Sequence, residues 1–396
     1  MKTERKLPAF APLACASHPN LGRRKVLGAL ATLPALVHSS LHAQDNGIIK
    51  IGQSIALSGP LGELGQAMHQ GAKACFAAVN AQGGIAGRKI ELSALDDGYD
   101  VKRALANLDT FLADKATFAL FNCMGTPMIE AMLPKVVETG IPFFAPFTGA
   151  LLARPGKVRN IFNIRASYPE EAEQLVQHLS TIGIKRIAIV YQNNSFGKEV
   201  YEGARLAMEK HKLTGSAVVT VEDNASDAGS AATKLAESNP EAVLVGLAGK
   251  PTIEFVKAIR SLRKGLPLYA LSIMGSSATI KSLGDDATGI AISQVMPLPT
   301  NTTVPVVREF QEAWKATGAQ QGASHLALEG YVNARVFVEV LRRAGRGLTR
   351  SSFIENAWGL KRYDLGGFEI GFSEPGKNAS RFVELTLVGR DGRFIR

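Results

Sequence analysis

From residue 48 the chain alternates short apolar runs with stretches of helical spacing, and the series restarts near residue 185. The first series predicts strands at 48–57, 89–95, 116–120 and 141–146, with helices at 67–82, 100–114 and 128–139. The second predicts strands at 185–191, 216–222, 241–247 and 266–272, with helices at 198–212, 228–238 and 252–263. Strands that alternate with helices form parallel sheets with helices on both faces, so the pattern predicts an α/β fold.

The restart predicts two Rossmann-like lobes. A chain of 396 residues is too long for one ordinary core. Both series also carry a similar glycine spacing one loop after their first strand, with Gly65 and Gly71 in one and Gly197 and Gly203 in the other. Two helices at 305–317 and 324–344 follow, and the tail predicts a strand pair from 368–372 and 381–388.

The N-terminal segment predicts export. Three basic residues at 23–25 precede a run of 12 uncharged residues at 26–37, which is too short to span a bilayer. A basic start, a short apolar core and a small-residue end at Ala43 are typical of a cleaved secretory signal. The order Arg-Arg-x-Val-Leu at 23–27 resembles a twin-arginine signal, although the general export route accepts the same residues. We therefore expect residues 1–43 to be a signal peptide and the protein to be periplasmic.

Charge and motifs exclude several function classes. Residues 1–43 hold six basic residues and one acidic, so 39 basic and 34 acidic residues follow them, a net charge of +5. These charges are scattered, so a nucleic-acid partner is not indicated. Phosphate-binding glycine motifs, a nucleophile elbow and metal-ligand clusters are all missing from the sequence, and we expect no catalytic residues, no cofactor and no metal. Cys75 and Cys123 are expected to be buried free thiols.

Ligands of open α/β sheets bind at the carboxyl ends of the strands. The loops at those ends are 56–60, 122–127, 146–150, 192–197, 248–251 and 272–277, which are short and rich in glycine or hydroxyl groups. In 122–127 we expect Thr126 to cap a helix, Pro127 to occupy its first position and Gly125 to let a carboxylate approach the backbone. A plain helix cap would account for Thr126 and Pro127 equally well.

Several motifs resemble the type I periplasmic solute-binding proteins, which include branched-chain amino-acid-binding components of ABC transporters. They are IKIGQSIALSGP at 49–60, NAQGGIAGRKIEL at 80–92, the Asp96-Asp97 pair, Gly-Ile-Pro at 140–142 and NIRASY at 163–168. Tyr191 and the Phe196-Gly197 pair match the family's first strand and turn of the second lobe. The resemblance covers nearly all of 48–396.

The resemblance implies two lobes around a ligand cleft, joined by three crossing segments near 165–168, 295–298 and 364–368. It divides the chain into 48–166 and 297–366 for lobe one, and 167–296 and 367–396 for lobe two. The implied partners are a small-molecule ligand and the membrane permease of an ABC transporter, and the protein is expected to be a monomer. The implied ligand-binding residues are Ser58, Met124, Gly125, Thr126, Phe147 and Thr148 of lobe one, with Phe196, Ala248, Ile273 and Met274 of lobe two.

The chain departs from its amino-acid-binding relatives in one loop. Those relatives place an acidic residue there to pair with the ligand's ammonium, but residues 272–276 read Ser-Ile-Met-Gly-Ser. The expected ligand is therefore a small carboxylate with an apolar or aromatic body and no α-amino group. An amino-acid-like ligand remains the alternative if an acid from elsewhere, such as Asp97 or Glu254, reaches the cleft. A ligand-sensing receptor of the same fold that reports to a signalling partner remains an alternative, and a two-lobed α/β enzyme is a third hypothesis. In some relatives the cysteine that matches Cys123 forms a disulfide with a cysteine just after the Asp-Asp pair. This chain has Gly98 and Tyr99 there, so we expect that disulfide to be missing.

Overall fold

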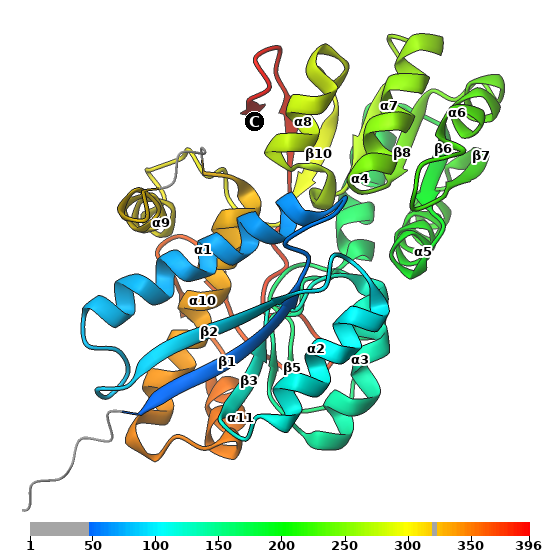
Figure 1. Ribbon diagram of the computed structural model, residues 1–396. Coiled ribbons are helices and arrows are strands. Elements are labelled where there is room, and N and C mark those ends of the chain that lie inside the picture. The colour runs from blue at the N-terminus through cyan, green and yellow to red at the C-terminus, as the bar shows by residue number, and fades with distance from the viewer. Residues whose placement is uncertain (1–46, 319–322) are drawn as a thin grey trace, which may run out of the picture. The chain divides into compact units, whose positions relative to one another are not determined.

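The computed structural model describes residues 47–318 and 323–396, in which two large sheets carry the predicted α/β fold (Figure 1). The first sheet has the order β2-β1-β3-β4-β5 and is parallel throughout. Its strands are β1 Ile48–Ile55, β2 Lys89–Asp96, β3 Thr117–Phe121, β4 Phe143–Phe144 and β5 Ile161–Phe162.

The second sheet has the order β14-β13-β10-β9-β8-β6-β7. Its parallel strands are β6 Arg186–Gln192, β7 Thr214–Val221, β8 Ala242–Gly246, β9 Leu268–Ala270 and β10 Ala291–Gln294. The strands β13 Glu384–Val388 and β14 Phe394–Ile395 extend one edge in antiparallel fashion. We call the parts of the chain built on the two sheets the first and the second lobe.

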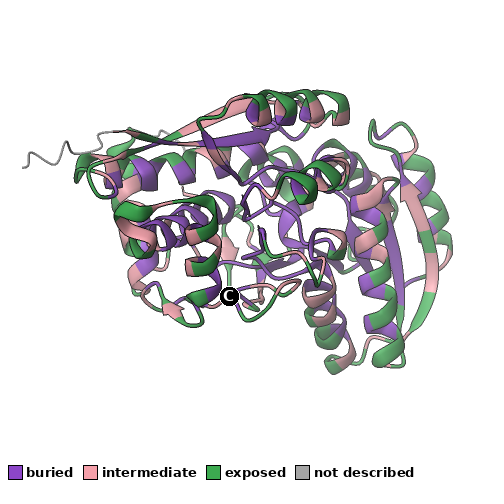
Figure 2. Ribbon diagram, turned by 90° about the horizontal axis from the view of Figure 1, so that it is seen from below, coloured by how far each residue is buried: buried purple, intermediate pink, exposed green. Residues whose placement is uncertain are grey.

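Helices cover both faces of each sheet, and buried residues line the strands between them (Figure 2). On the first sheet, α1 Gly62–Ala81, α9 Pro305–Ala316, α10 His325–Ala344 and α11 Arg350–Gly359 cover one face, and α2 Val101–Ala113 and α3 Thr126–Thr139 the other. On the second, α4 Tyr168–Thr181 and α5 Ser195–Lys210 cover one face, and α6 Ala228–Glu237, α7 Lys250–Leu262 and α8 Ser277–Leu283 the other.

Local signals account for several helix boundaries. Asp100 caps α2 as predicted, because its side chain accepts a hydrogen bond of 2.8 Å from the Arg103 N–H. Helix α4 was not predicted, although it begins with a capping box in which Ser167 and Glu170 satisfy each other's backbone N–H groups. Its buried residues Ala172, Leu175 and Leu179 also follow a helical spacing.

Helix α1 begins at Gly62, one turn earlier than predicted, because glycines 62 and 65 are sites of close packing rather than turn residues. A β-carbon on Gly65 would lie 1.8 Å from the Ala56 carbonyl oxygen, just after β1. Gly197 repeats this contact in the second lobe, where a β-carbon would lie 1.9 Å from the Gln192 oxygen at the end of β6. The shared glycine spacing thus marks an equivalent strand–helix joint in both lobes.

The chain passes between the sheets three times, after β5, after β10 and before β13. The tail does not form the predicted strand pair: β12 Glu369–Ile370 pairs with β11 Tyr363–Asp364, whereas β13 pairs with β10 and β14. Phe368, Ile370 and Phe372 belong to the core of the first sheet. We therefore propose that the first lobe continues from 297 to about 380, rather than to 366, and that the third crossing lies just before β13.

Cys75 and Cys123 are free and buried, as expected, and burial raises the pKa of each thiol to about 12. Residues 1–43, for which a signal peptide is predicted, lie outside the described residues. Within 47–318 and 323–396, none of the helices has the length and apolar character needed to cross a membrane.

Candidate functional site

A small cavity lies where the carboxyl ends of the central strands of both sheets meet. The strand order switches between β1 and β3 in the first sheet and between β6 and β8 in the second, which is where open sheets bind ligands. The cavity volume is about 20 Å³, room for about one water molecule. The residues that line it are Leu61, Leu64, Tyr99, Met124, Gly125, Thr126, Phe147, Tyr168, Phe196, Ala248 and Ile273.

Seven of the residues predicted from the sequence lie in this lining: Met124, Gly125, Thr126, Phe147, Phe196, Ala248 and Ile273. Ser58 lies outside it, and its hydroxyl donates a hydrogen bond of 2.5 Å to Asp96. Met274 packs in the core behind the second sheet. Thr148 is fully buried and reaches the cavity through Thr126.

Gly125 shapes the first-lobe end of the cavity. Its φ of 96° lies in the left-handed region, and a β-carbon there would come within 2.1 Å of the Met128 side chain and 2.7 Å of the Tyr99 ring. Gly125 itself is the N-cap residue of α3 and Thr126 is its first helical residue, so the predictions that Thr126 caps this helix and that Pro127 is its first residue are both wrong. Because the first helical N–H groups have no intrahelical partner, the start of α3 presents donors and a partial positive charge to the cavity.

A pair of buried hydroxyl groups stands at the same end. Thr126 Oγ1 lies 2.8 Å from Thr148 Oγ1, and Thr148 Oγ1 also accepts a hydrogen bond of 3.1 Å from the Ala150 N–H. Thr148 therefore fixes the Thr126 hydroxyl beside the start of α3. This combination of a hydroxyl and a helix N-terminus suits the carboxylate of a ligand.

The remaining walls are aromatic and aliphatic. Tyr168 and Phe196 meet edge to face with ring centroids 5.3 Å apart, and Tyr99 and Phe147 contribute two further rings. Sequence reasoning missed Tyr99, Tyr168, Leu61 and Leu64. Tyr99 could have been found, because it lies in the turn after β2, three residues beyond Asp96, and strand ends are where ligands bind.

None of the described residues in the lining carries a charge. Two acids close in sequence to the lining are not part of it: Asp97 accepts hydrogen bonds from the Ser54 hydroxyl and the Tyr99 N–H, and Glu254 is exposed. The site thus has no counter-ion for an ammonium group within its described lining.

A buried charged network lies behind Phe147. The Arg165 guanidinium lies over the Phe147 ring, 5.2 Å from the ring centroid. It donates hydrogen bonds to the Glu171 carboxylate at 3.1 Å and to the Ser272 hydroxyl at 2.5 Å. Glu329 of α10 approaches the same guanidinium at 3.6 Å. Burial raises the pKa of Glu329 to about 7, although the Arg165 charge opposes this. Arg165 therefore links the first crossing segment to residues of both lobes.

Three contacts join the lobes at the rim of the cavity. Glu63 of α1 accepts a hydrogen bond of 2.8 Å from the Ala278 N–H, and Glu199 of α5 accepts one of 2.8 Å from the Leu151 N–H. A β-carbon on Gly249 would lie 2.4 Å from the Leu61 side chain, so the backbone of the second lobe packs directly on the first. We call this arrangement, in which the two lobes are in contact and the cavity has room for about one water molecule, the closed form.

The fold and site define a two-lobed solute receptor, and comparison with known proteins agrees. The model of a family described as periplasmic binding protein matches residues 48–393, so the chain belongs to that family, as a type I member. Leu/Ile/Val-binding protein homolog 8 of Brucella abortus (strain 2308) is 23% identical over 92% of this chain and 94% of its own length. Homolog 3 of Brucella melitensis biotype 1 is 24% identical, and the chain matches only 54% of its length.

Solved structures with the same fold are also similar to this chain. A substrate-binding periplasmic protein from Ralstonia solanacearum is 32% identical, with a TM-score of 0.82 over 88% of this chain and 99% of that protein. A solute-binding protein of an ABC transporter from R. palustris, solved in complex with benzoate, is 19% identical, with a TM-score of 0.78 over 88% of this chain and 95% of that protein. The second likeness shows the fold alone.

Proposed function

We propose that this protein captures a small carboxylate with an apolar or aromatic body and delivers it to the permease of an ABC transporter. The observation that supports this proposal is that the two ends of the cavity differ in chemistry. Thr126 and the start of α3 offer hydrogen-bond donors at one end, and aromatic and aliphatic side chains form the rest. Nothing in this proposal requires a catalytic group.

The uncharged lining favours acids without an α-amino group. A buried ammonium without a partner costs several kcal/mol, which would weaken amino-acid binding by roughly a thousandfold or more. The benzoate carried by the R. palustris protein is an acid of the proposed kind. The names of the Brucella relatives point instead to branched-chain amino acids, so the two ligand classes can be tested against each other.

The cavity must enlarge to admit such a ligand, because its volume of about 20 Å³ is far below the several hundred that small-molecule sites usually provide. A hinge at the crossing segments would supply this space by separating the lobes. Ligand contacts to both lobes would then favour a form in which the lobes close on the ligand over the open one.

Isothermal titration calorimetry tests the ligand class. Leucine and phenylalanine are compared with their desamino analogues, 4-methylpentanoate and 3-phenylpropanoate, and with benzoate. The proposal expects at least one of the acids without an amino group to bind and the amino acids to bind far more weakly. Tight binding of the amino acids alone would reverse the proposal.

A further inference from the structure

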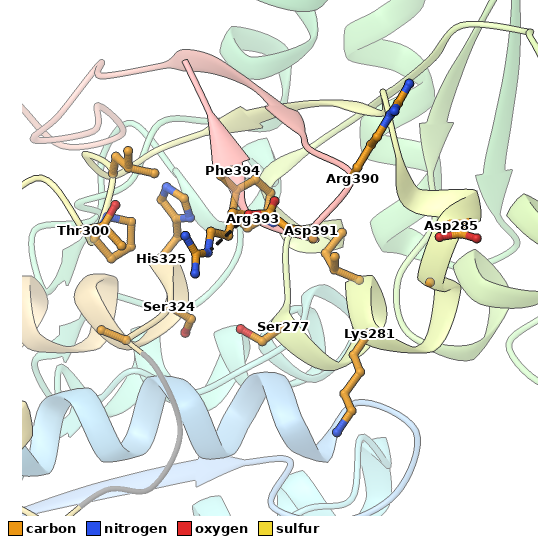
Figure 3. A pocket seen from close by; sticks show the side chains of 16 residues that line it. Ser277, Lys281, Asp285, Thr300, Ser324, His325, Arg390, Asp391, Arg393 and Phe394 are labelled. Carbon is orange, nitrogen blue, oxygen red and sulfur yellow. Dashed lines mark hydrogen bonds and ion pairs between the residues drawn. The ribbon is translucent and has the colours of Figure 1, made fainter.

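A second and much larger cavity, of about 560 Å³, lies apart from the cleft (Figure 3). Its walls come from α8 and the turn between β13 and β14 in the second lobe, and from the start of α10 and residues 298–300. A volume of this size is typical of small-molecule sites. Residues of this cavity do not overlap with those that line the cleft.

His325 is the residue that points to a ligand. Its side chain lies in the cavity wall and is only 5% exposed, yet neither ring nitrogen has a hydrogen-bond partner in the described part of the chain. Burial lowers the pKa of His325 to about 3, so its ring is neutral at ordinary pH and offers one N–H donor and one acceptor. Leaving such buried groups unpaired is costly, and a bound ligand would remove part of that cost.

The surroundings of His325 combine apolar surface with charged side chains, of which three are basic (Lys281, Arg390 and Arg393) and two are acidic (Asp285 and Asp391). Figure 3 shows Arg393 beside His325, and this side chain is 85% exposed and lies 3.4 Å from the Asp391 carboxylate. The His325 ring meets the Phe394 ring edge to face at 5.1 Å, and Ile280 and Leu298 add aliphatic walls. His325 is also the first residue of the 20-residue helix α10, whose N-terminal dipole favours an anion.

We propose that this cavity binds a small organic anion with an apolar body, such as an aryl carboxylate, through the His325 ring N–H and the Arg393 guanidinium. The apolar body would pack against Phe394, Ile280 and Leu298. Such a ligand would contact α8 of one lobe and α10 of the other, so it would act as a second ligand that favours the closed form. This inference is independent of what the cleft itself binds.

The first test locates the ligand. Crystals soaked with para-bromobenzoate reveal each bound molecule through anomalous scattering from bromine. The proposal expects a bromine peak in the cavity beside His325 whether or not the cleft is also occupied. A peak in the cleft alone, or no peak at all, would overturn it.

The second test measures binding in solution. Long-range ¹H–¹⁵N spectra follow the His325 ring nitrogens as para-bromobenzoate is added, with the His325→Gln variant used for assignment. The ring signals should shift in the wild type. In Ser277→Trp the new side chain fills the cavity from an exposed position on α8, and the shift should vanish. An equal shift in Ser277→Trp would show that the His325 signals respond to binding in the cleft, and would refute binding in this second cavity.

A comparison of two arginine variants distinguishes a specific contact of Arg393 with the ligand from a general effect of net charge. Arg393→Gln should weaken binding in this cavity by about two- to fivefold, the size expected for loss of one exposed ion pair to the ligand. Arg381→Gln removes the same charge from a side chain that is 82% exposed and lies 3.7 Å from Glu170, away from the cavity. Equal affinities for the two variants would contradict the proposed contact.

Discussion

Replacing Thr126 with valine is the sharpest test of the anion end of the cleft. Thr126 is 1% exposed, its hydroxyl lies 2.8 Å from that of Thr148, and valine has nearly the same shape. A hydrogen bond to a charged ligand contributes about 1.5–3 kcal/mol, so Thr126→Val should raise the Kd for the cognate carboxylate by roughly ten- to a hundredfold. The Thr148 hydroxyl keeps its bond from the Ala150 N–H, so we expect a loss of folding stability of about 1 kcal/mol or less.

Thr252 provides the matched control in the second lobe. It lies in the first turn of α7, is fully buried and has a hydroxyl without a hydrogen-bond partner in the described residues, and it does not line the cleft. Thr252→Val removes that unpaired group, so it should leave the affinity unchanged and raise the unfolding free energy by about 1 kcal/mol. Calorimetry gives the affinities and urea denaturation the stabilities. Wild-type affinity in Thr126→Val would refute the assignment of this hydroxyl to the ligand.

Three further predictions concern closure, pH and packing. The radius of gyration from small-angle scattering should fall when ligand is added, and an unchanged radius at saturation would argue against a hinge. Glu63→Gln should raise the fraction of the open form, because it weakens the hydrogen bond from the Ala278 N–H. The raised pKa of Glu329 means that the folded protein holds this proton more tightly than the unfolded chain. Its contribution to the unfolding free energy should therefore fall by up to about 3 kcal/mol as pH rises from 4.5 to about 7, and urea titrations of Glu329→Gln should lack that slope. Gly65→Ala should lower the unfolding free energy by about 1–3 kcal/mol because the new β-carbon overlaps the Ala56 oxygen, and an unchanged melting curve would contradict that close contact.

Most of the fold could be predicted because strands and helices alternate with strong periodicity. The errors arose where a residue type has more than one structural use. The helix was predicted to begin at residue 67, after glycines 62 and 65, but these glycines lie within α1, and Gly65 allows it to pack on the end of β1. The tail 368–388 contains two extended runs, which were predicted to pair with each other. The sequence could not show that the first run pairs with β11 and the second with β10.

The site was predicted less completely than the fold. The strand-end rule selected the loops that contain Thr126 and Phe196, the family resemblance implied both residues as ligand contacts, and both line the cavity. Tyr99 was missed because it enters the cavity from the turn after β2, in a left-handed conformation with φ of 64° that its residue type does not suggest. Ser58 was assigned to the ligand, but the structure commits its hydroxyl to Asp96, a tertiary contact that local sequence does not reveal.

The closed form rests on few polar contacts, and this bears on how the receptor responds to its ligand. The bonds of Glu63 and Glu199 across the rim are single hydrogen bonds at partly exposed sites, each contributing about 0.5–1.5 kcal/mol. Arg165 lies at the first crossing and contacts acidic residues of both lobes, Glu171 and Glu329, so it adds a buried link between the lobes. A balance of a few kcal/mol between open and closed forms lies within reach of the binding energy of one small carboxylate. The contacts that the ligand makes with both walls of the cleft would therefore decide which form is populated.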